Sequence, residues 1–151
     1  RGELTTSLLY HNPQLSMVSV DLWNDHADIV ESHPHDSNYG HFIRILEENK
    51  VSERCKIIRK LTTEACDDIE DESLDFIYVD ATHTSEAVSK DLTCWIPKVK
   101  ESGFICGHDY HIAWGMIPVF ESLGGKEALN VEECTSWWLP KRDLIGKWKE
   151  L

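Results

Sequence analysis

Short apolar runs alternate with amphipathic stretches along the chain, most clearly between residues 74 and 110. The run Phe76–Val79 consists mostly of β-forming apolar residues and ends at an acid, Asp80, and the run Phe104–Cys106 has the same character. Between them, apolar side chains repeat with helical spacing at Val88, Leu92, Trp95, Ile96 and Val99. The pattern predicts a strand, a crossover helix over Ser85–Val99 and a second, parallel strand. Open α/β sheets bind ligands at the carboxyl ends of their strands, so we expect the chemistry of the protein there.

The remaining segments continue this alternation. Helices are predicted at Leu4–His11, at Ser37–Asn49, from Thr62 and at Trp114–Leu123, and strands at Met17–Leu22, Cys55–Leu61, Leu129–Glu133 and Ser136–Leu139. The last two strands should pair antiparallel, with the adjacent Trp137 and Trp138 on opposite faces of the sheet. The predicted fold is α/β, a Rossmann-like, mostly parallel sheet with helices on both faces and an antiparallel C-terminal strand. A length of 151 residues indicates a single domain, residues 1–151.

The start of the sequence lacks the strand that such a fold needs first. Arg1, Gly2 and Glu3 lead straight into the first helical pattern. We therefore expect the sequence to begin inside a glycine-rich strand-to-helix turn, so that the first strand is missing and the domain is incomplete at its N-terminus.

The charge of the chain changes the range of expected partners. With 27 acidic and 15 basic residues the net charge is −12 at pH 7, and Lys and Arg do not cluster along the sequence. Nucleic acid binding needs a concentrated basic surface, so no nucleic acid partner is expected. The sequence shows no signal peptide and no long apolar span, which predicts a cytoplasmic protein with no membrane partner.

The cysteines suggest neither a zinc ribbon nor a redox pair, because their number is odd and no two are spaced as CxxC. They are Cys55, Cys66, Cys94, Cys106 and Cys134. The expectation is that they are small buried thiols in a reducing compartment.

Polar residues that follow predicted strands are the candidates for function. Asp21 ends a strand about twenty residues after Gly2, a spacing that can place a carboxylate beside a ribose; the alternative is a surface acid. Asp80 and the pair His108–Asp109 follow the two central strands, although Asp109 could equally cap the next helix.

Two further features concern histidines. His83 is either a catalytic base or a solvent-exposed histidine at a helix start. The polar stretch Trp23–Gly40 contains several histidines and acids, but their spacing fits no tetrahedral metal set and Pro34 interrupts any helix. We interpret this stretch as a lid or substrate loop.

The two central runs carry a family resemblance. Asp75-Phe76-Ile77-Tyr78-Val79-Asp80-Ala81-Thr82-His83 and Ser102-Gly103-Phe104-Ile105-Cys106-Gly107-His108-Asp109-Tyr110 resemble the class I S-adenosylmethionine-dependent methyltransferases. The chain is most similar to their small-molecule O-methyltransferase branch. That branch includes the catechol and caffeoyl-CoA enzymes, the macrolide-sugar O-methyltransferases and the cephalosporin-hydroxylase-like proteins. The resemblance covers nearly the whole chain.

The resemblance implies S-adenosylmethionine as cofactor. Gly2 would be the last glycine of the cofactor loop, Asp21 would hold the ribose hydroxyls, and Leu61 with Thr62 would border the adenine. Asp80 is also assigned to the cofactor side of the site.

The resemblance also implies a divalent cation, Mg²⁺ or Mn²⁺, held by Asp80, His108 and Asp109. It implies His83 and Asp80 as catalytic residues. The sequence departs from the family in three places, the first being that the acid-x-Gly start of the cofactor loop is absent from it. Thr82 stands where many relatives have a second acid, and His108 replaces an oxygen ligand. A nitrogen ligand shifts the metal preference from Mg²⁺ towards Mn²⁺, Fe²⁺ or Zn²⁺.

Three functions remain open from the sequence. The first is metal-assisted O-methylation of a small hydroxylated molecule, sugar-like or another metabolite. The second is a non-methylating, metal-dependent relative of the hydroxylase-like kind, and the third is a catalytically silent domain that uses the fold for binding. The expected partner is a small-molecule substrate, and homo-oligomerisation is left open.

Overall fold

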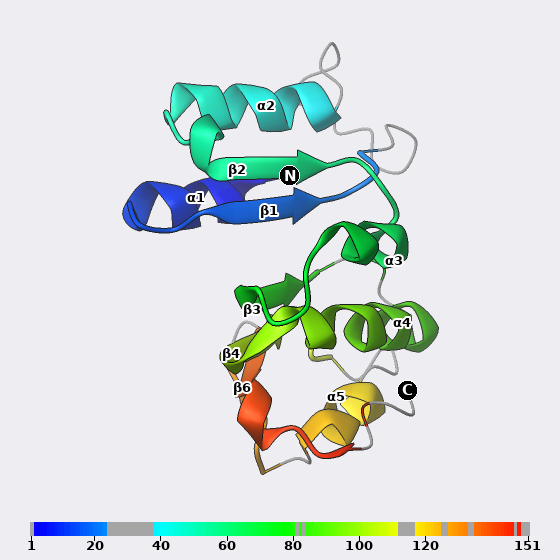
Figure 1. Ribbon diagram of the computed structural model, residues 1–151. Coiled ribbons are helices and arrows are strands. Elements are labelled where there is room, and N and C mark those ends of the chain that lie inside the picture. Colours follow the sequence, from blue (N-terminus) through cyan, green and yellow to red (C-terminus); the bar gives the residue numbers. More distant parts are fainter. Residues whose placement is uncertain are drawn as a thin grey trace. The chain divides into compact units, whose positions relative to one another are not determined.

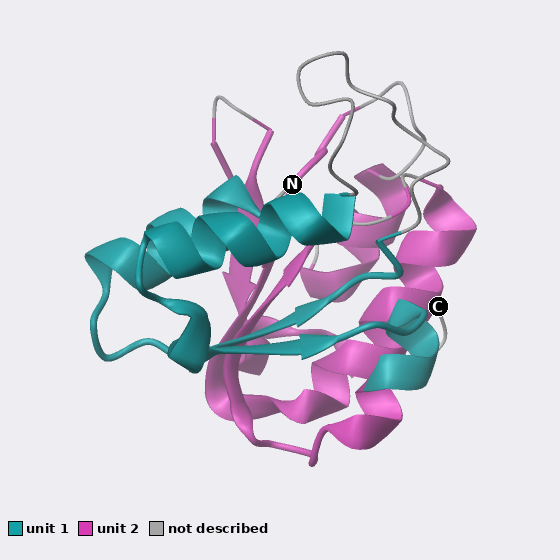
Figure 2. Ribbon diagram, turned by 90° about the horizontal axis from the view of Figure 1, so that it is seen from above, with its two compact units in different colours: residues 1–65 teal, residues 66–151 magenta. Residues whose placement is uncertain are grey.

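The structure is a computed structural model that describes residues 2–23, 38–80, 82, 84–111, 117–124, 127–132, 135–146 and 148. The chain divides into two compact units, Arg1–Ala65 and Cys66–Leu151 (Figure 2). Each unit is an α/β assembly with its own sheet, and the two are described separately below.

Unit 1, residues 1–65, has a pair of parallel strands and two main helices (Figure 1). Its elements are α1 (Glu3–His11), β1 (Met17–Val20), α2 (Asn38–Glu48), the 3₁₀ turn η1 (Ser52–Arg54), β2 (Cys55–Ile58) and α3 (Thr62–Ala65). Strand β1 pairs with β2 in parallel, from Met17 opposite Cys55 to Val20 opposite Ile58. The predicted helices and strands of this unit are therefore confirmed, with strands that end two or three residues earlier than expected.

The core of unit 1 forms where α1 and α2 turn their apolar sides inward. Leu9, Phe42 and Leu46 are almost completely buried, with Val51 and Cys55 beside them. A polar contact adds to this packing, because the half-buried Arg54 donates hydrogen bonds to three main-chain carbonyls at and after the end of α1. They belong to Leu9 (2.6 Å), Asn12 (3.0 Å) and Leu15 (2.8 Å).

Unit 2, residues 66–151, has a four-stranded sheet in the order β3-β4-β6-β5. Its elements are η2 (Cys66–Asp68), β3 (Leu74–Val79), α4 (Ser85–Trp95), η3 (Ile96–Lys98), β4 (Val99–Gly107), α5 (Ile117–Gly124), β5 (Asn130–Val131), β6 (Trp137–Pro140) and η5 (Lys141–Asp143). Strands β3 and β4 are parallel, whereas β6 runs antiparallel to both β4 and β5. The predicted mixed α/β fold with an antiparallel C-terminal strand is confirmed.

One face of the unit 2 sheet packs against helices α4 and α5 (Figure 1). Buried side chains on that face belong to alternate strand positions, which are Ile77, Ile105, Trp137 and Leu139. Trp137 is fully buried and its neighbour Trp138 is 37% exposed, so the two tryptophans face opposite sides as predicted.

The predicted crossover helix is too long in its last turn. Helix α4 ends at Trp95, and Val99, which the helical pattern included, is the first residue of β4. Pro97 explains the difference, because its ring has no N–H to donate within a continued helix.

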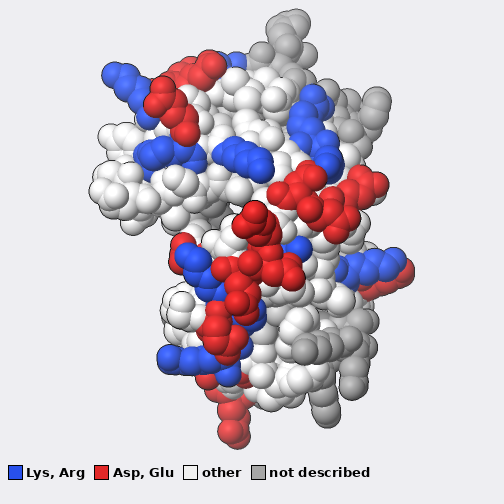
Figure 3. All heavy atoms as spheres, in the orientation of Figure 1, with Lys and Arg blue, Asp and Glu red and all other residues white. Residues whose placement is uncertain are grey.

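The surface agrees with the acidic composition. On the face that Figure 3 shows, Asp and Glu side chains gather over unit 2 with Lys side chains among them. Within unit 2, Lys98 Nζ lies 2.7 Å from Asp71 Oδ1, and Lys100 Nζ lies 2.7 Å from Asp75 Oδ1. Among the described residues, no helix is long and apolar enough to cross a membrane.

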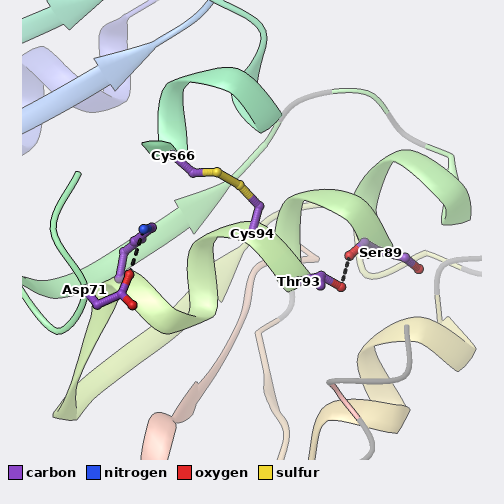
Figure 4. Close-up of a disulfide and its surroundings, with 6 residues drawn as sticks. Cys66, Asp71, Ser89, Thr93 and Cys94 are labelled. Carbon is purple, nitrogen blue, oxygen red and sulfur yellow. Dashed lines mark hydrogen bonds and ion pairs between the residues drawn. A yellow bond between two sulfur atoms is a disulfide. The ribbon is translucent and has the colours of Figure 1, made fainter. Parts of the chain in front are cut away.

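The expectation that all cysteines are free thiols is wrong for two of them. Cys66, at the start of η2, and Cys94, near the end of α4, form a disulfide within unit 2 (Figure 4). The two residues are 28 positions apart in the sequence, and only the fold brings their Cα atoms to 6.2 Å. Cys55 and Cys106 are free. The predicted compartment stays a prediction.

Candidate functional site

The carboxyl ends of β3 and β4 bring three of the predicted site residues together. The parallel register places Val79 opposite Gly107, and the His108 N–H continues the pairing by donating to the Val79 carbonyl at 3.1 Å. Asp80 follows β3 directly, and His108 and Asp109 follow β4. One potential ligand atom from each of these three side chains lies within 4.8 Å of the other two. The structure thus brings these three residues together, and their role as metal ligands stays a prediction.

The histidine of this group is held on both sides of its ring. His108 Nδ1 lies 2.8 Å from Asp109 Oδ1, and His108 Nε2 lies 3.4 Å from the hydroxyl oxygen of Thr135. The backbone is held as well, because the buried indole N–H of Trp137 donates to the His108 carbonyl at 3.1 Å. The ring orientation of His108 is therefore fixed by Asp109, which follows β4, and by Thr135 in the β5–β6 connection.

Asp109 combines burial with an unusual backbone. Its side chain is only 11% exposed, and its φ of 64° lies in the left-handed region that few residues other than glycine adopt. Thr135 has a φ of 67°, and its carbonyl accepts a hydrogen bond from the Tyr110 N–H at 2.9 Å. Backbone strain of this kind is retained where surrounding contacts impose it, and it often marks functional positions.

Thr135 is a site residue that the sequence analysis missed. The predicted terminal hairpin was right, but its position beside β4 was not evident. Gly107 pairs with Trp137, and this register brings the residue two positions before Trp137 close to the residue after Gly107. The only available signal was the hairpin itself.

The neighbouring titratable groups do not supply a nucleophile. Burial raises the pKa of the Cys106 thiol to about 11, and its Sγ–H donates to the Ile77 carbonyl at 3.0 Å. Burial also raises the pKa of Tyr110, with a further contribution from Glu121, which accepts a hydrogen bond from the Tyr110 hydroxyl at 3.3 Å. Both groups stay protonated at neutral pH and serve packing.

The predicted cofactor residues other than Asp80 belong to unit 1. Gly2 caps α1 with a φ of 93°, and a Cβ there would collide with the ring of Phe42, so packing alone requires a glycine. The carboxylate of Asp21 is exposed and accepts a hydrogen bond from the Trp23 N–H at 2.7 Å. Leu61 is 48% exposed and Thr62 begins α3.

Two sequence hypotheses concern residues outside the described part of the chain. His83, the predicted base, is one of them. Residues 24–37, most of the predicted lid, are the other. The roles assigned to these residues stay predictions.

With the fold and site described, the chain can be compared with known proteins. Residues 1–110 match the methyltransferase domain family, and the chain belongs to this family. The resemblance to class I S-adenosylmethionine-dependent methyltransferases is thereby confirmed at the level of family and fold.

Individual relatives are more distant. The chain is 34% identical over 97 residues to the uncharacterized protein y4gI of Sinorhizobium fredii (strain NBRC 101917 / NGR234), a match that covers 62% of this chain and 10% of that protein. Among solved structures, it resembles CalS11, the TDP-rhamnose 3'-O-methyltransferase of calicheamicin biosynthesis, with a TM-score of 0.59 and 13% identity, over 90% of this chain and 65% of that one.

An O-methyltransferase family protein of Burkholderia thailandensis gives a TM-score of 0.58 with 11% identity, over 91% of this chain and 46% of that one. At these identities the likeness shows the fold alone. The chain spans about a tenth of the y4gI protein and no more than two thirds of these two solved chains.

Proposed function

We propose that this chain transfers the methyl group of S-adenosylmethionine to a hydroxyl oxygen of a small molecule, with a divalent cation at Asp80, His108 and Asp109. Its membership of the methyltransferase family supports the cofactor. The observation that carries the metal-assisted form is the meeting of these three side chains at the ends of β3 and β4.

The donor set suits a divalent cation. Asp80 is exposed and Asp109 is buried, and a nitrogen of His108 completes a mixed oxygen and nitrogen set. A bound divalent cation would lower the pKa of a coordinated hydroxyl and so make it a better nucleophile at neutral pH. Asp80, His108 and Asp109 would hold the cation at the ends of β3 and β4.

The proposed reaction is a direct displacement. The acceptor oxygen forms a bond to the methyl carbon while the carbon–sulfur bond breaks, and its electron pair remains on sulfur. The hydroxyl proton passes either to a base, which is the role predicted for His83, or to solvent. Most of the acceleration comes from holding oxygen, carbon and sulfur in line, which is a task of positioning residues.

The acceptor is proposed to be a small hydroxylated molecule rather than a nucleic acid. The net charge of −12 and the acidic face of unit 2 disfavour a polyphosphate partner (Figure 3). A metal at the ligand edge favours acceptors that can offer two adjacent oxygens, such as a sugar or another vicinal diol.

The test is methyl transfer from labelled S-adenosylmethionine to a panel of diols and sugars, with added Mn²⁺ and with EDTA. Asp80→Asn should lower the rate at least about 100-fold, because the reacting groups are no longer positioned. Asp75→Asn is the matched control, since Asp75 is an exposed acid of the same strand whose ion pair with Lys100 lies away from the strand's carboxyl end. Equal rates for the two variants would contradict the proposal.

One observation favours the non-methylating alternative. His108 offers a nitrogen ligand, and a mixed histidine and carboxylate set also suits iron in oxidation chemistry. Product analysis separates the two functions, because hydroxylation would consume oxygen and leave the methyl label on the cofactor.

A further inference from the structure

The contact between His108 and Asp109 determines which nitrogen of the histidine is available. A carboxylate only accepts hydrogen bonds, so the Nδ1 atom, 2.8 Å from Asp109 Oδ1, carries a proton. In the neutral imidazole the Nε2 atom then presents its lone pair. The Thr135 hydroxyl, 3.4 Å away, is placed to donate to that lone pair.

The arrangement is built into the fold rather than left to a mobile side chain. The Asp109 carboxylate is 11% exposed, and its left-handed backbone turns it back towards the preceding residue. The His108 carbonyl is tied to the buried indole of Trp137. The Asp80 carboxylate, in contrast, is exposed and belongs to the same group of potential ligand atoms.

We infer that Asp80 and His108 Nε2 are the direct metal ligands, whereas Asp109 is a positioning residue that orients the histidine through Nδ1. This inference rests on the metal-assisted function proposed above and changes the predicted ligand set, in which Asp109 bound the metal itself. Histidines that bind metals usually donate their second ring N–H to a carboxylate in this way.

The inference has a consequence for the choice of metal. With Nε2 as a direct ligand, the site offers nitrogen together with carboxylate oxygen. Mg²⁺ strongly prefers oxygen ligands and keeps much of its water, whereas Mn²⁺, Fe²⁺ and Zn²⁺ accept imidazole. The site should therefore select a transition metal over Mg²⁺.

The deciding experiment observes the ring nitrogens of His108 by two-dimensional ¹⁵N–¹H NMR while ZnCl₂ is added to the intact chain. We expect a protonated Nδ1 before and after addition, and the larger shift at the Nε2 resonance on zinc binding. Assignment uses His108→Gln, which removes the signal. Loss of the Nδ1 proton on zinc binding, or no zinc-dependent change at His108, would overturn the inference.

Calorimetric titrations with Mn²⁺, Zn²⁺ and Mg²⁺ give the second measurement. Asp109→Asn should weaken zinc binding about 10–100-fold and keep the shift at Nε2, because asparagine tolerates the left-handed backbone but holds the ring less well. His108→Asn should remove the preference for Zn²⁺ over Mg²⁺. Binding of Mg²⁺ as tight as that of Zn²⁺ in the unmodified chain would contradict the inference.

The two proposals fail in different ways. Zinc binding through Nε2 without methyl transfer to any hydroxylated acceptor would leave the ligand assignment standing and refute the proposed reaction. Methyl transfer that is unaffected by EDTA, with no zinc shift at His108, would refute the ligand assignment and leave the transferase.

Discussion

The two units of this chain look alike in sequence and differ in construction. In both, short apolar strands alternate with amphipathic helices. The described residues of unit 1 pair two strands and surround Phe42 and Leu46 with a small core. Unit 2 joins four strands, packs two helices over Trp137 and Leu139, and carries a disulfide. A two-strand sheet needs helices packed on it for stability, so we expect unit 1 to be the weaker of the two.

The comparison also concerns function. The ligand group of Asp80, His108 and Asp109 lies in the more heavily braced unit 2, whereas the other predicted cofactor residues lie in unit 1. Metal ligands must be held rigidly. The positive φ angles of Asp109 and Thr135 also persist only where well-packed neighbouring residues impose them. The proposed metal ligands therefore lie in the unit that we expect to be the more stable.

The largest effect is expected for Trp137→Ala. The fully buried indole packs at 4.4 Å between ring centroids against Phe120, and its loss also removes the N–H partner of the His108 carbonyl. Unfolding free energy should fall by about 3–5 kcal/mol. Hydrogen exchange should show lost protection in unit 2 first.

Trp138→Ala is the matched control, because Trp138 is 37% exposed and loses mainly its edge contact with Phe104. It should cost about 1 kcal/mol. Equal costs for the two substitutions, measured by urea unfolding, would mean that the buried face is not the core of unit 2.

The next effect concerns the disulfide between Cys66 and Cys94. Closing a loop between residues 28 positions apart should stabilise unit 2 by about 3–4 kcal/mol, because the disulfide lowers the conformational entropy of the unfolded chain. The double substitution of both cysteines by serine should therefore lower the urea midpoint, and a reducing agent should do the same to the unmodified chain. A midpoint insensitive to reductant would show that the bond does not brace unit 2.

Arg54 tests the weaker unit. Its guanidinium fork reaches three carbonyls that lysine cannot satisfy together, so Arg54→Lys should cost about 2 kcal/mol. Arg59→Lys is the control, since Arg59 makes one 3.4 Å hydrogen bond to the Leu22 carbonyl and lies over the Tyr39 ring. Exchange in unit 1 should accelerate only for Arg54→Lys. Equally accelerated hydrogen exchange in both units would show that they unfold together, which would contradict a difference in stability between them.

The smallest effect is a pH dependence carried by Cys106. Burial raises the pKa of this thiol from 9.0 to about 11, so the unfolded chain loses the proton at a lower pH than the folded one. Its contribution to stability is complete below about pH 9 and is lost as pH rises towards 11. At pH 10 the free energy of unfolding should be about 1 kcal/mol lower than at neutral pH because of this thiol.

Cys106→Ser should therefore flatten the alkaline loss of stability relative to the unmodified chain, while stability at pH 7.5 changes little. Urea titrations at the two pH values measure this. Cys55→Ser gives the parallel test in unit 1, where burial also raises the thiol pKa. An unchanged alkaline slope in Cys106→Ser would contradict the assigned pKa shift.

Sequence reasoning predicted what depends on local patterns and missed what depends on packing. The central strands and the position of Asp80 beside His108 follow from periodicity and from the parallel crossover. The disulfide, the place of Thr135 and the hydrogen bond from His108 to Asp109 depend on contacts between distant segments or on backbone angles. Pro97 indicates a helix end near Trp95. The predicted helix was nevertheless extended to Val99, because Val99 continues the helical spacing of apolar residues. The single-domain interpretation and the assigned roles of the site residues stay predictions.

Cofactor binding is the property that a methyltransferase domain must have, so calorimetric titration with S-adenosylmethionine is the most direct test of function. The chain should bind it with a micromolar Kd, and Asp21→Asn should weaken binding about 10–100-fold. Asparagine can still accept the hydrogen bond from Trp23 N–H, so the loss would report the missing charge rather than a broken turn. The absence of heat, on protein in which exchange shows both units folded, would contradict the assignment of this chain as a cofactor-binding methyltransferase domain.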